Sequence, residues 1–286
     1  MKSLIAVLAL ATAAFAAHPL PFLFAFGQNL SLPAGLVLCA DSGIAVTDPG
    51  KNCVFKYSFS GALIAETGGA SSGALGLNTP SGITRRRGFD LFVSDERNSR
   101  LVQYDNNLCL LSSLRLSSKK SQTPFYPAAI AAGNDGTLFV CDRLNNAIMR
   151  VEKDNSVTPF LKTYRDLNGA PLVPCAIAVA GNAICVADAA AGAIFVFDRF
   201  GTLVRSFTTD HSIPAGGLAA CGDTAIVAAD ARQRSLTTYS IQGAKGAEYS
   251  LENASGNCVP GAICCGFGRW YIVDTQGKRI CVFSIP

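Results

Sequence analysis

Histidine, the side chain most often used for metal binding and proton transfer, is scarce in this sequence. There are two histidines, His18 and His211. A site of three convergent imidazoles, as in many zinc enzymes, is therefore impossible. If an amino-terminal leader were cleaved after Ala17, His18 would become the first residue and could hold copper, but no second ligand is apparent and a linker histidine is the preferred interpretation. We expect no metal and no cofactor.

Cysteine is the other reactive residue that the sequence offers, and Cys264 and Cys265 are adjacent. Vicinal thiols can bind metal or act in redox chemistry, but no Cys-x-x-Cys pair occurs. The pair falls in a row that other repeats fill with small apolar residues, such as Ala131-Ala132, so a structural thiol or disulfide is preferred. A total of eleven cysteines predicts an oxidising compartment and disulfide bonds, with at least one thiol left over. The spacing leaves the pairing open.

Six aspartates recur at spacings of 47, 47, 46, 42 and 44 residues, each after a short apolar stretch. A ring of six carboxylates could attract cations. Aspartate also accepts hydrogen bonds from backbone N–H groups two or three residues further on, and this structural role is preferred because it explains the regular spacing. The predicted turn caps are Asp48, Asp95, Asp142, Asp188, Asp230 and Asp274.

Basic side chains gather in the six-residue loops that follow these aspartates. Acids there are fewer, namely Glu96 and the aspartates themselves. If the loops share one face, the basic residues form a positive rim that could bind an acidic protein or a sulfated glycan. The hairpin run Arg85-Arg86-Arg87 is expected to be ordinary solvated surface. The predicted rim consists of Lys51, Arg97, Arg100, Arg143, Arg232, Arg234, Lys278 and Arg279.

The elements that position these residues are short strands in a sixfold repeat. Apolar residues stand four and two residues before each aspartate, as Leu91 and Val93 do before Asp95, and this alternation indicates a strand. Each unit thus supplies an inner strand, a second strand that ends at the aspartate, a loop and a third strand, and a fourth strand follows in five units. Five units carry an aromatic residue in the third strand, which we expect to pack between neighbouring units: Tyr57, Tyr104, Phe197, Tyr239 and Phe283. A proline opens each unit: Pro33, Pro80, Pro127, Pro174, Pro214 and Pro260.

The sixth unit ends at Pro286 without a fourth strand. Residues 21–27 have the alternating pattern of a strand and can supply the missing fourth strand. Without it, an open ring would leave an unpaired edge and an exposed apolar face. The sequence therefore predicts an all-β fold. This fold is a six-bladed β-propeller of four-stranded antiparallel blades, closed by pairing of the amino-terminal strand with the last blade.

The repeat resembles the NHL repeat, most clearly in Pro80-Ser81-Gly82-Ile83 followed by Leu91-Phe92-Val93-Ser94-Asp95. The resemblance covers nearly all of the chain after the leader, and it implies a propeller while leaving the function open. Related propellers include calcium-dependent lactonases and a zinc-dependent amidating lyase. The residue pairs after the six opening prolines contain no carboxylate, histidine or amide, so the inner ring cannot supply the six or more oxygen ligands that calcium needs.

The first residues have the character of a secretory signal, with Lys2, an apolar run and Ala14-Phe15-Ala16. We assign 1–16 to a signal peptide and 17–286 to the propeller, and expect a secreted, extracellular monomer without a membrane span. Two sequons make Asn29 and Asn253 candidate glycosylation sites. A formal net charge of +4 gives no reason to expect nucleic acid as a partner.

The residue pairs after the opening prolines, which we expect at the mouth of the propeller channel, carry no reactive side chain. Two functional hypotheses follow. The preferred one is a secreted, non-catalytic binding or scaffold protein for a protein or anionic glycan ligand. The alternative is a propeller hydrolase or lyase, lactonase-like or amidating-lyase-like, with a site on loops that offer Asp166, Asn168 or His211.

Overall fold

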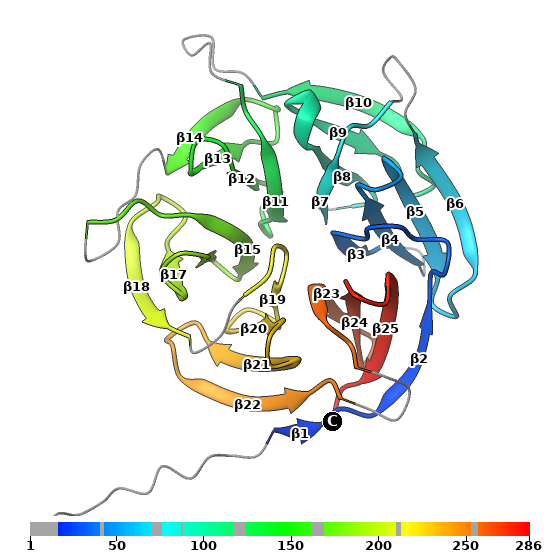
Figure 1. Ribbon diagram of the computed structural model, residues 1–286. Helices are drawn as coiled ribbons and strands as arrows, with labels where there is room; N and C mark the ends of the chain where they lie inside the picture. Colours follow the sequence, from blue (N-terminus) through cyan, green and yellow to red (C-terminus); the bar gives the residue numbers. More distant parts are fainter. Residues whose placement is uncertain are drawn as a thin grey trace, which may run out of the picture.

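The computed structural model describes residues 17–40, 43–69, 76–86, 88–116, 124–161, 169–209, 213–252 and 257–286. In Figure 1 the sheets are arranged as blades around a common centre. The predicted six blades of four antiparallel strands are confirmed. None of the helical segments in these ranges is long and apolar enough to cross a membrane. The segment 1–16, assigned above to a signal peptide, lies outside the described residues.

Each blade runs from an inner strand at the channel to an outer strand at the rim. Blade 1 is β3 (Leu36–Leu38), β4 (Gly43–Asp48), β5 (Cys53–Ser58) and β6 (Leu63–Gly68). Blade 2 is β7 (Pro80–Arg85), β8 (Leu91–Asp95), β9 (Arg100–Tyr104) and β10 (Leu110–Arg115), with the 3-10 turn η1 (Glu96–Asn98). Blade 3 is β11 (Pro127–Ala132), β12 (Leu138–Asp142), β13 (Ala147–Val151) and β14 (Val157–Leu161).

Blades 4 to 6 repeat this order. Blade 4 is β15 (Pro174–Ala180), β16 (Ala183–Asp188), β17 (Ala193–Phe197) and β18 (Leu203–Thr208). Blade 5 is β19 (Leu218–Ala220), β20 (Ala225–Asp230), β21 (Ser235–Ser240) and β22 (Lys245–Ser250). Blade 6 is β23 (Pro260–Gly266), β24 (Arg269–Asp274), β25 (Arg279–Ser284) and, from the other end of the chain, β2 (Phe22–Phe26).

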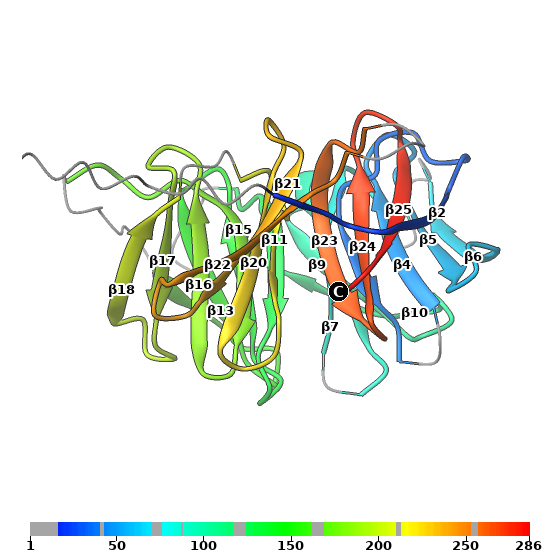
Figure 2. The ribbon, with the colours of Figure 1, turned by 90° about the horizontal axis from the view of Figure 1, so that it is seen from below.

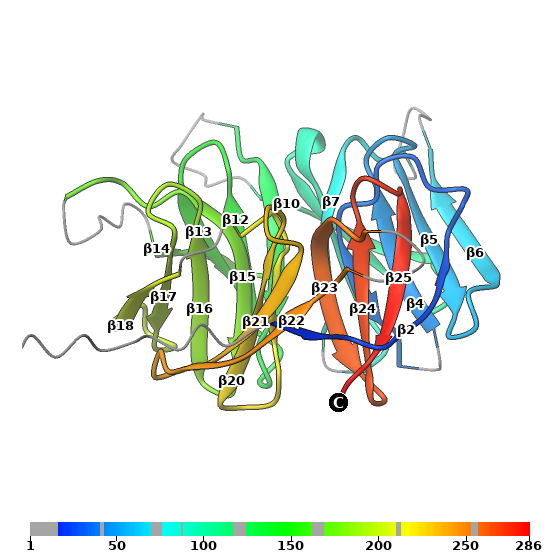
Figure 3. The same ribbon diagram turned by 60° about the horizontal axis from the view of Figure 1, so that its bottom comes forward.

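The ring closes as predicted, because β2 pairs antiparallel with β25 and Phe26 lies opposite Ile280. A second contact was not predicted. The two-residue strand β1 (His18–Pro19) runs parallel to β22 of blade 5, so the amino-terminal segment bridges two blades before it completes the sixth (Figure 3). Leu20 follows β1 and is 2% exposed among residues of blades 5 and 6, including Trp270. The closing strand is therefore anchored on both sides of the boundary between these blades.

Apolar side chains fill the spaces between neighbouring blades. The aromatic row of the third strands is buried, as predicted, and its members lie in clusters that combine residues of two blades. Phe197, for example, packs with Phe139 and Ile148 of blade 3. Tyr57 packs with Tyr271 of blade 6. Burial of this row fixes the strand register, because a slip by one residue would turn every ring to the opposite face of its sheet.

The loops after the second strands share one backbone feature in all six blades. Their fourth residue adopts the left-handed conformation at Asn52, Ser99, Asn146, Gly192, Arg234 and Lys278, with φ between 49° and 57°. The repeated turn carries the residue immediately after each aspartate to an equivalent place in its blade.

Candidate functional site

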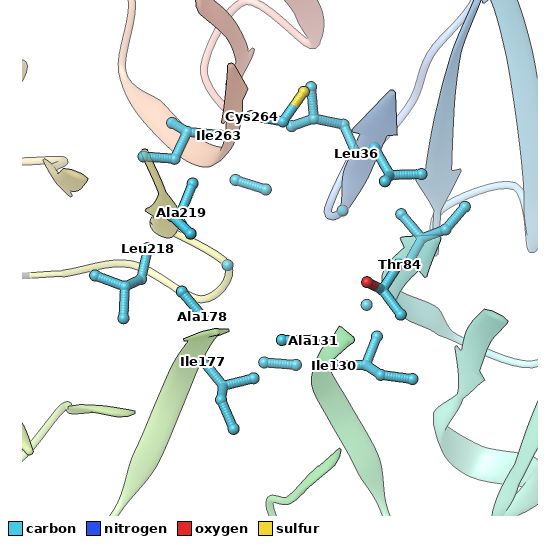
Figure 4. A pocket seen from close by; sticks show the side chains of 18 of the residues that line it. Leu36, Thr84, Ile130, Ala131, Ile177, Ala178, Leu218, Ala219, Ile263 and Cys264 are labelled. Atoms are coloured by element: carbon cyan, nitrogen blue, oxygen red, sulfur yellow. The ribbon is translucent and has the colours of Figure 1, made fainter. Parts of the chain in front are cut away.

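The central channel holds a cavity of about 330 Å³ lined by the inner strands of the blades. Figure 4 shows Leu36, Ile130, Ile177, Leu218 and Ile263 around it, with the hydroxyl of Thr84 and the thiol of Cys264 as the labelled polar groups. Arg85 and Cys265 also line this cavity, at the ends of their inner strands. The channel therefore suits an apolar group and offers no carboxylate or imidazole among its described lining residues.

A second cavity of about 240 Å³ lies at the opposite mouth of the channel, where the inner strands begin. Most of its wall is proline, alanine and glycine. The polar side chains in the wall belong to Ser81, Arg143 and Thr275. The Ser81 hydroxyl is directed at backbone, at 3.3 Å from the carbonyl oxygen of Pro127. Arg143 is therefore the charged side chain that this mouth presents.

Three lining residues of the mouth, Pro49, Arg143 and Thr275, occupy the same position in their repeats, immediately after the turn aspartate. The equivalent residues of the other three blades, Glu96, Ala189 and Ala231, are not among the lining residues of this cavity. The equivalent residue of blade 2 is Glu96, which precedes Arg143 by one blade. Opposite charges thus occupy equivalent positions in adjacent blades.

Glu96 and Arg143 meet across the boundary between blades 2 and 3. Oε1 of Glu96 lies 3.5 Å from Nη1 of Arg143, and their side chains are 10% and 54% exposed. Oε2 of Glu96 is buried and has no hydrogen-bond partner among the described residues. A buried carboxylate oxygen left without a donor is costly in a purely structural role. Glu96 does not line the cavity itself, and its carboxylate adjoins the mouth through its contact with Arg143.

The six turn aspartates point their carboxylates into their own loops. Oδ1 of Asp188 accepts the N–H groups of Ala190 at 2.7 Å and Ala191 at 2.8 Å, two and three residues on. Oδ2 of the same residue accepts the N–H of Val173, in the segment that enters the inner strand. Asp48, Asp95, Asp142, Asp230 and Asp274 likewise accept backbone donors of their blades. Their oxygens are occupied by the fold.

The basic residues of the predicted rim fall into two groups. Arg100 donates from Nε to Asp95 at 2.6 Å and Arg279 does the same to Asp274 at 3.0 Å, so these guanidinium groups support the turns. Arg234 lies 3.9 Å from Glu252. The residues that remain exposed on the loops are Lys51, Arg97, Arg143, Arg232 and Lys278.

The cysteines are a second set of candidate nucleophiles. Cys175 stands near the start of its inner strand, where its thiol contacts the carbonyl oxygens of Ala187 and Ile213 at 3.4 and 3.6 Å. Burial raises the pKa of Cys175 to about 11, and burial also raises the pKa values of Cys141 and Cys264. These thiols stay protonated at neutral pH and are poor nucleophiles. Cys221 and Cys265 differ, since their sulfur atoms lie 3.8 Å apart across two blades.

One cluster of metal-ligand type occurs among the described residues, formed by Cys258, Asp274 and Cys281, all buried. Asp274 already accepts the N–H groups of Val259 and Gly277 and the Nε–H of Arg279. A guanidinium group beside the carboxylate opposes a cation, and no fourth ligand is present in the cluster. The cluster does not fit zinc.

Several residues named from the sequence lie outside the described residues, namely Arg87, Asp166, Asn168, His211 and Asn253. His18 and Asn29 are described, and both are exposed. His18 lies in β1, at the edge of blade 5 and away from the channel.

The residue pairs after the opening prolines, from which the sequence predicts the mouth, carry no reactive side chain. The row directly after the aspartates is not part of that prediction, in which Arg143 is a rim residue and Glu96 an acid of the loops. A signal was present, because this row reads Pro49, Glu96, Arg143, Ala189, Ala231 and Thr275, with two opposite charges in consecutive repeats.

No family model matches the chain, and no curated protein matches it, so the NHL assignment remains a prediction. Solved structures do match. A gluconolactonase from Xanthomonas campestris has a TM-score of 0.69 at 10% identity, covering 90% of this chain and 87% of that one. Regucalcin, a calcium-binding protein from Agrobacterium tumefaciens, has a TM-score of 0.65 at 14% identity, covering 94% and 96%.

A catalytically inactive variant of virginiamycin B lyase from Staphylococcus aureus, solved with quinupristin, has a TM-score of 0.63 at 16% identity, covering 89% and 80%. The residues that line the channel here do not fit a calcium ion such as regucalcin binds, because they supply no carboxylate. The preferred hypothesis of a non-catalytic scaffold is corrected by these comparisons, since structures of this fold include a lactonase and a lyase. At such low identity the comparisons themselves establish the fold, and this chain is a six-bladed β-propeller of the architecture shared by the gluconolactonase and virginiamycin lyase propellers.

Proposed function

We propose that this protein is an enzyme, a lyase or hydrolase that acts on a small, largely apolar carbonyl compound at the mouth of the propeller channel. The observation that carries the proposal is the pair formed by Glu96 and Arg143. One carboxylate oxygen of Glu96 has no hydrogen-bond partner among the described residues, and the guanidinium group of Arg143 lines the cavity at this mouth.

The pair supplies the two groups that both reaction types require. A carboxylate can accept a proton, either from water that attacks an ester or lactone carbonyl or from carbon in an elimination. A guanidinium group can stabilise the oxygen that becomes negative in either transition state. Proton acceptance is assigned to Oε2 of Glu96 and charge stabilisation to Arg143. Neither assignment needs a metal ion.

The walls define the class of substrate. Pro33, Pro49, Pro214 and the alanine and glycine residues of the inner strands line the mouth, and the channel beyond is aliphatic. A ligand would place an apolar group in the channel and a carbonyl oxygen at Arg143. Charged sugars and phosphate esters match this lining poorly, because one guanidinium group would face several buried anionic or hydroxyl groups.

Turnover of defined probes tests the proposal. We would incubate the purified protein with para-nitrophenyl butyrate, dihydrocoumarin, an aliphatic lactone and the cyclic depsipeptide quinupristin, and follow the products by absorbance and mass spectrometry. On a probe that is turned over, Glu96→Gln should lower kcat by about 10²- to 10⁴-fold. Arg143→Gln should lower it by about 10²- to 10³-fold.

Arg97→Gln is the matched control, because Arg97 is an exposed arginine on the same loop as Glu96 and does not line the mouth. It should retain wild-type activity. Absence of turnover on every probe, or equal activity of Glu96→Gln and wild type, contradicts the proposal.

We also propose that the protein is exported. The leader-like residues 1–16, the cysteine count and the exposed position of Asn29 support this. Expression in a eukaryotic cell should place the protein in the medium with a new amino terminus at Ala17 or His18. An Asn29→Gln variant should lose any mobility shift that an endoglycosidase causes at this site. Retention of the intact chain inside the cell would contradict export.

A further inference from the structure

Cys221 and Cys265 face each other across the boundary between blades 5 and 6. Cys221 directly follows the inner strand β19, and Cys265 lies near the end of the inner strand β23. Their Sγ atoms are 3.8 Å apart, and Cys265 Sγ also lies 3.5 Å from the carbonyl oxygen of Ala220. Both side chains are partly exposed, and Cys265 lines the channel cavity.

The adjacent residue Cys264 is not an equivalent partner for Cys221. Successive side chains of a strand point to opposite faces of the sheet. Cys264 accordingly packs in the cluster between blades 6 and 1, whereas Cys265 packs with Ala219 and Cys221 in the cluster between blades 5 and 6. The vicinal cysteines therefore belong to two different blade boundaries.

The same boundary is crossed at its outer edge by the amino-terminal segment. There β1 pairs with β22 of blade 5 and β2 pairs with β25 of blade 6 (Figure 2). Along the chain β22 of blade 5 is followed by β23 of blade 6, and the closing segment is held against both blades by backbone pairing. A bond between the inner strands would lock the boundary on its channel side as well.

We propose that Cys221 and Cys265 form a disulfide bond that joins blades 5 and 6 at the channel wall. The oxidant is a small-molecule disulfide such as oxidised glutathione. The thiolate of Cys265 attacks one sulfur of the oxidant, which leaves Cys265 in a mixed disulfide with one glutathione and releases the other glutathione as a thiolate. The thiolate of Cys221 then attacks Cys265 Sγ and releases the second glutathione thiolate. Two protons leave the cysteines, and two electrons reduce the oxidant to two thiols.

The geometry and the acidity of the pair favour this sequence of steps. A disulfide requires an S–S distance of about 2.05 Å, so side-chain rotation and a small approach of the two strands must close the remaining gap. The hydrogen bond from the Cys221 thiol lowers the pKa of Cys265, while the same contact, together with burial, raises the pKa of Cys221. Cys265 is thus the thiol that ionises first and attacks first.

The bond is tested by peptide mapping of the whole protein. Reduced protein is desalted, treated with oxidised glutathione, blocked with N-ethylmaleimide under denaturing conditions and digested with trypsin. Cleavage after Arg205, Arg232, Lys245 and Arg269 places Cys221 in peptide 206–232 and Cys265 in peptide 246–269. We expect a linked species of these two peptides that disappears after reduction.

Serine variants assign the bond, because peptide 246–269 also contains Cys258 and Cys264. Cys264→Ser is the matched control and should keep the linked species, whereas Cys265→Ser and Cys221→Ser should lose it. Circular dichroism verifies that each variant is folded. The proposal is overturned if peptides 206–232 and 246–269 of the wild-type protein are recovered entirely in the alkylated form. It is also overturned if the linked species persists in Cys265→Ser. The readout is independent of catalytic activity, so the enzyme proposal and the disulfide proposal can fail separately.

Discussion

The phenol of Tyr57 donates a hydrogen bond of 2.6 Å to Oδ1 of Asn29. Tyr57 lies on the third strand of blade 1, and Asn29 lies in the turn that follows the closing strand β2. The bond links the closing segment to the first blade, next to the contact between the rings of Tyr57 and Phe26 at 5.2 Å. Tyr57→Phe should lower the free energy of unfolding by about 0.5 to 1.5 kcal/mol, as urea denaturation would show.

Alkaline pH should destabilise the protein through its buried tyrosines. Burial raises the pKa values of Tyr57 and Tyr104 to about 12. In the unfolded chain tyrosine ionises near pH 10. The stabilising contribution is complete below about pH 10 and is lost as pH rises toward 12, because the unfolded state releases its protons first.

Urea midpoints at pH 8 and pH 11 measure this loss of stability. The double variant Tyr57→Phe, Tyr104→Phe should lose less stability between the two pH values than wild type. Equal losses in the two proteins would show that other groups are responsible.

Two arginines of the loops should differ strongly in their effect on stability. The Arg100 side chain is 12% exposed and its pair with Asp95 is buried, so Arg100→Gln should cost about 3 kcal/mol or more. Arg143 is mostly exposed, and Arg143→Gln should cost about 1 kcal/mol or less. Thermal and urea unfolding of both variants give the comparison. A large loss in Arg143→Gln would mean that its effect on activity reflects unfolding.

The amino-terminal segment should be required for a closed ring. Deletion of residues 17–27 leaves the edges of β22 and β25 unpaired and uncovers the cluster that Leu20 fills. We expect aggregation or a strongly lowered melting temperature, visible by size-exclusion chromatography and calorimetry. Leu20→Ala alone should cost about 2 to 5 kcal/mol. A soluble deletion product with unchanged melting would contradict the role of this segment.

Phe197 and Phe200 provide a matched test of packing between blades. Phe197 is fully buried at the boundary of blades 3 and 4, and Phe197→Ala should cost about 3 to 5 kcal/mol. Phe200 is 71% exposed, and Phe200→Ala should cost about 0.5 kcal/mol or less. Chemical denaturation measures both losses. Similar values for the two variants would be incompatible with the observed register.

The cluster of Cys258, Asp274 and Cys281 should hold no zinc. Its carboxylate is occupied by backbone donors and by Arg279. After dialysis against zinc and removal of free metal, elemental analysis should find well below one zinc per chain. A stoichiometric content that is lost in Cys281→Ser would refute this expectation.

The number of blades, the strand order within each blade and the identity of the closing strand can all be predicted from the residue pattern alone. These features follow from local rules. Apolar side chains recur at every second residue of a strand, and the units repeat a proline, an aspartate and, in most units, a buried aromatic side chain at similar spacings. Asp95 and Phe197 could therefore be placed without coordinates, because their roles depend on neighbours within a few residues or on a pattern present in every repeat.

The side-chain contacts between blades could not be predicted in this way and are seen in the folded structure. Glu96 and Arg143 are 47 positions apart, and Cys221 and Cys265 are 44 positions apart. Their contacts depend on the radius of the ring, the path of the loops and the side-chain rotamers. The pairing of β1 with β22 likewise involves two residues on each strand, too few to leave a pattern. Contacts of this kind arise from the packing of whole blades. They do not recur in every repeat, so they leave no periodic pattern in the sequence.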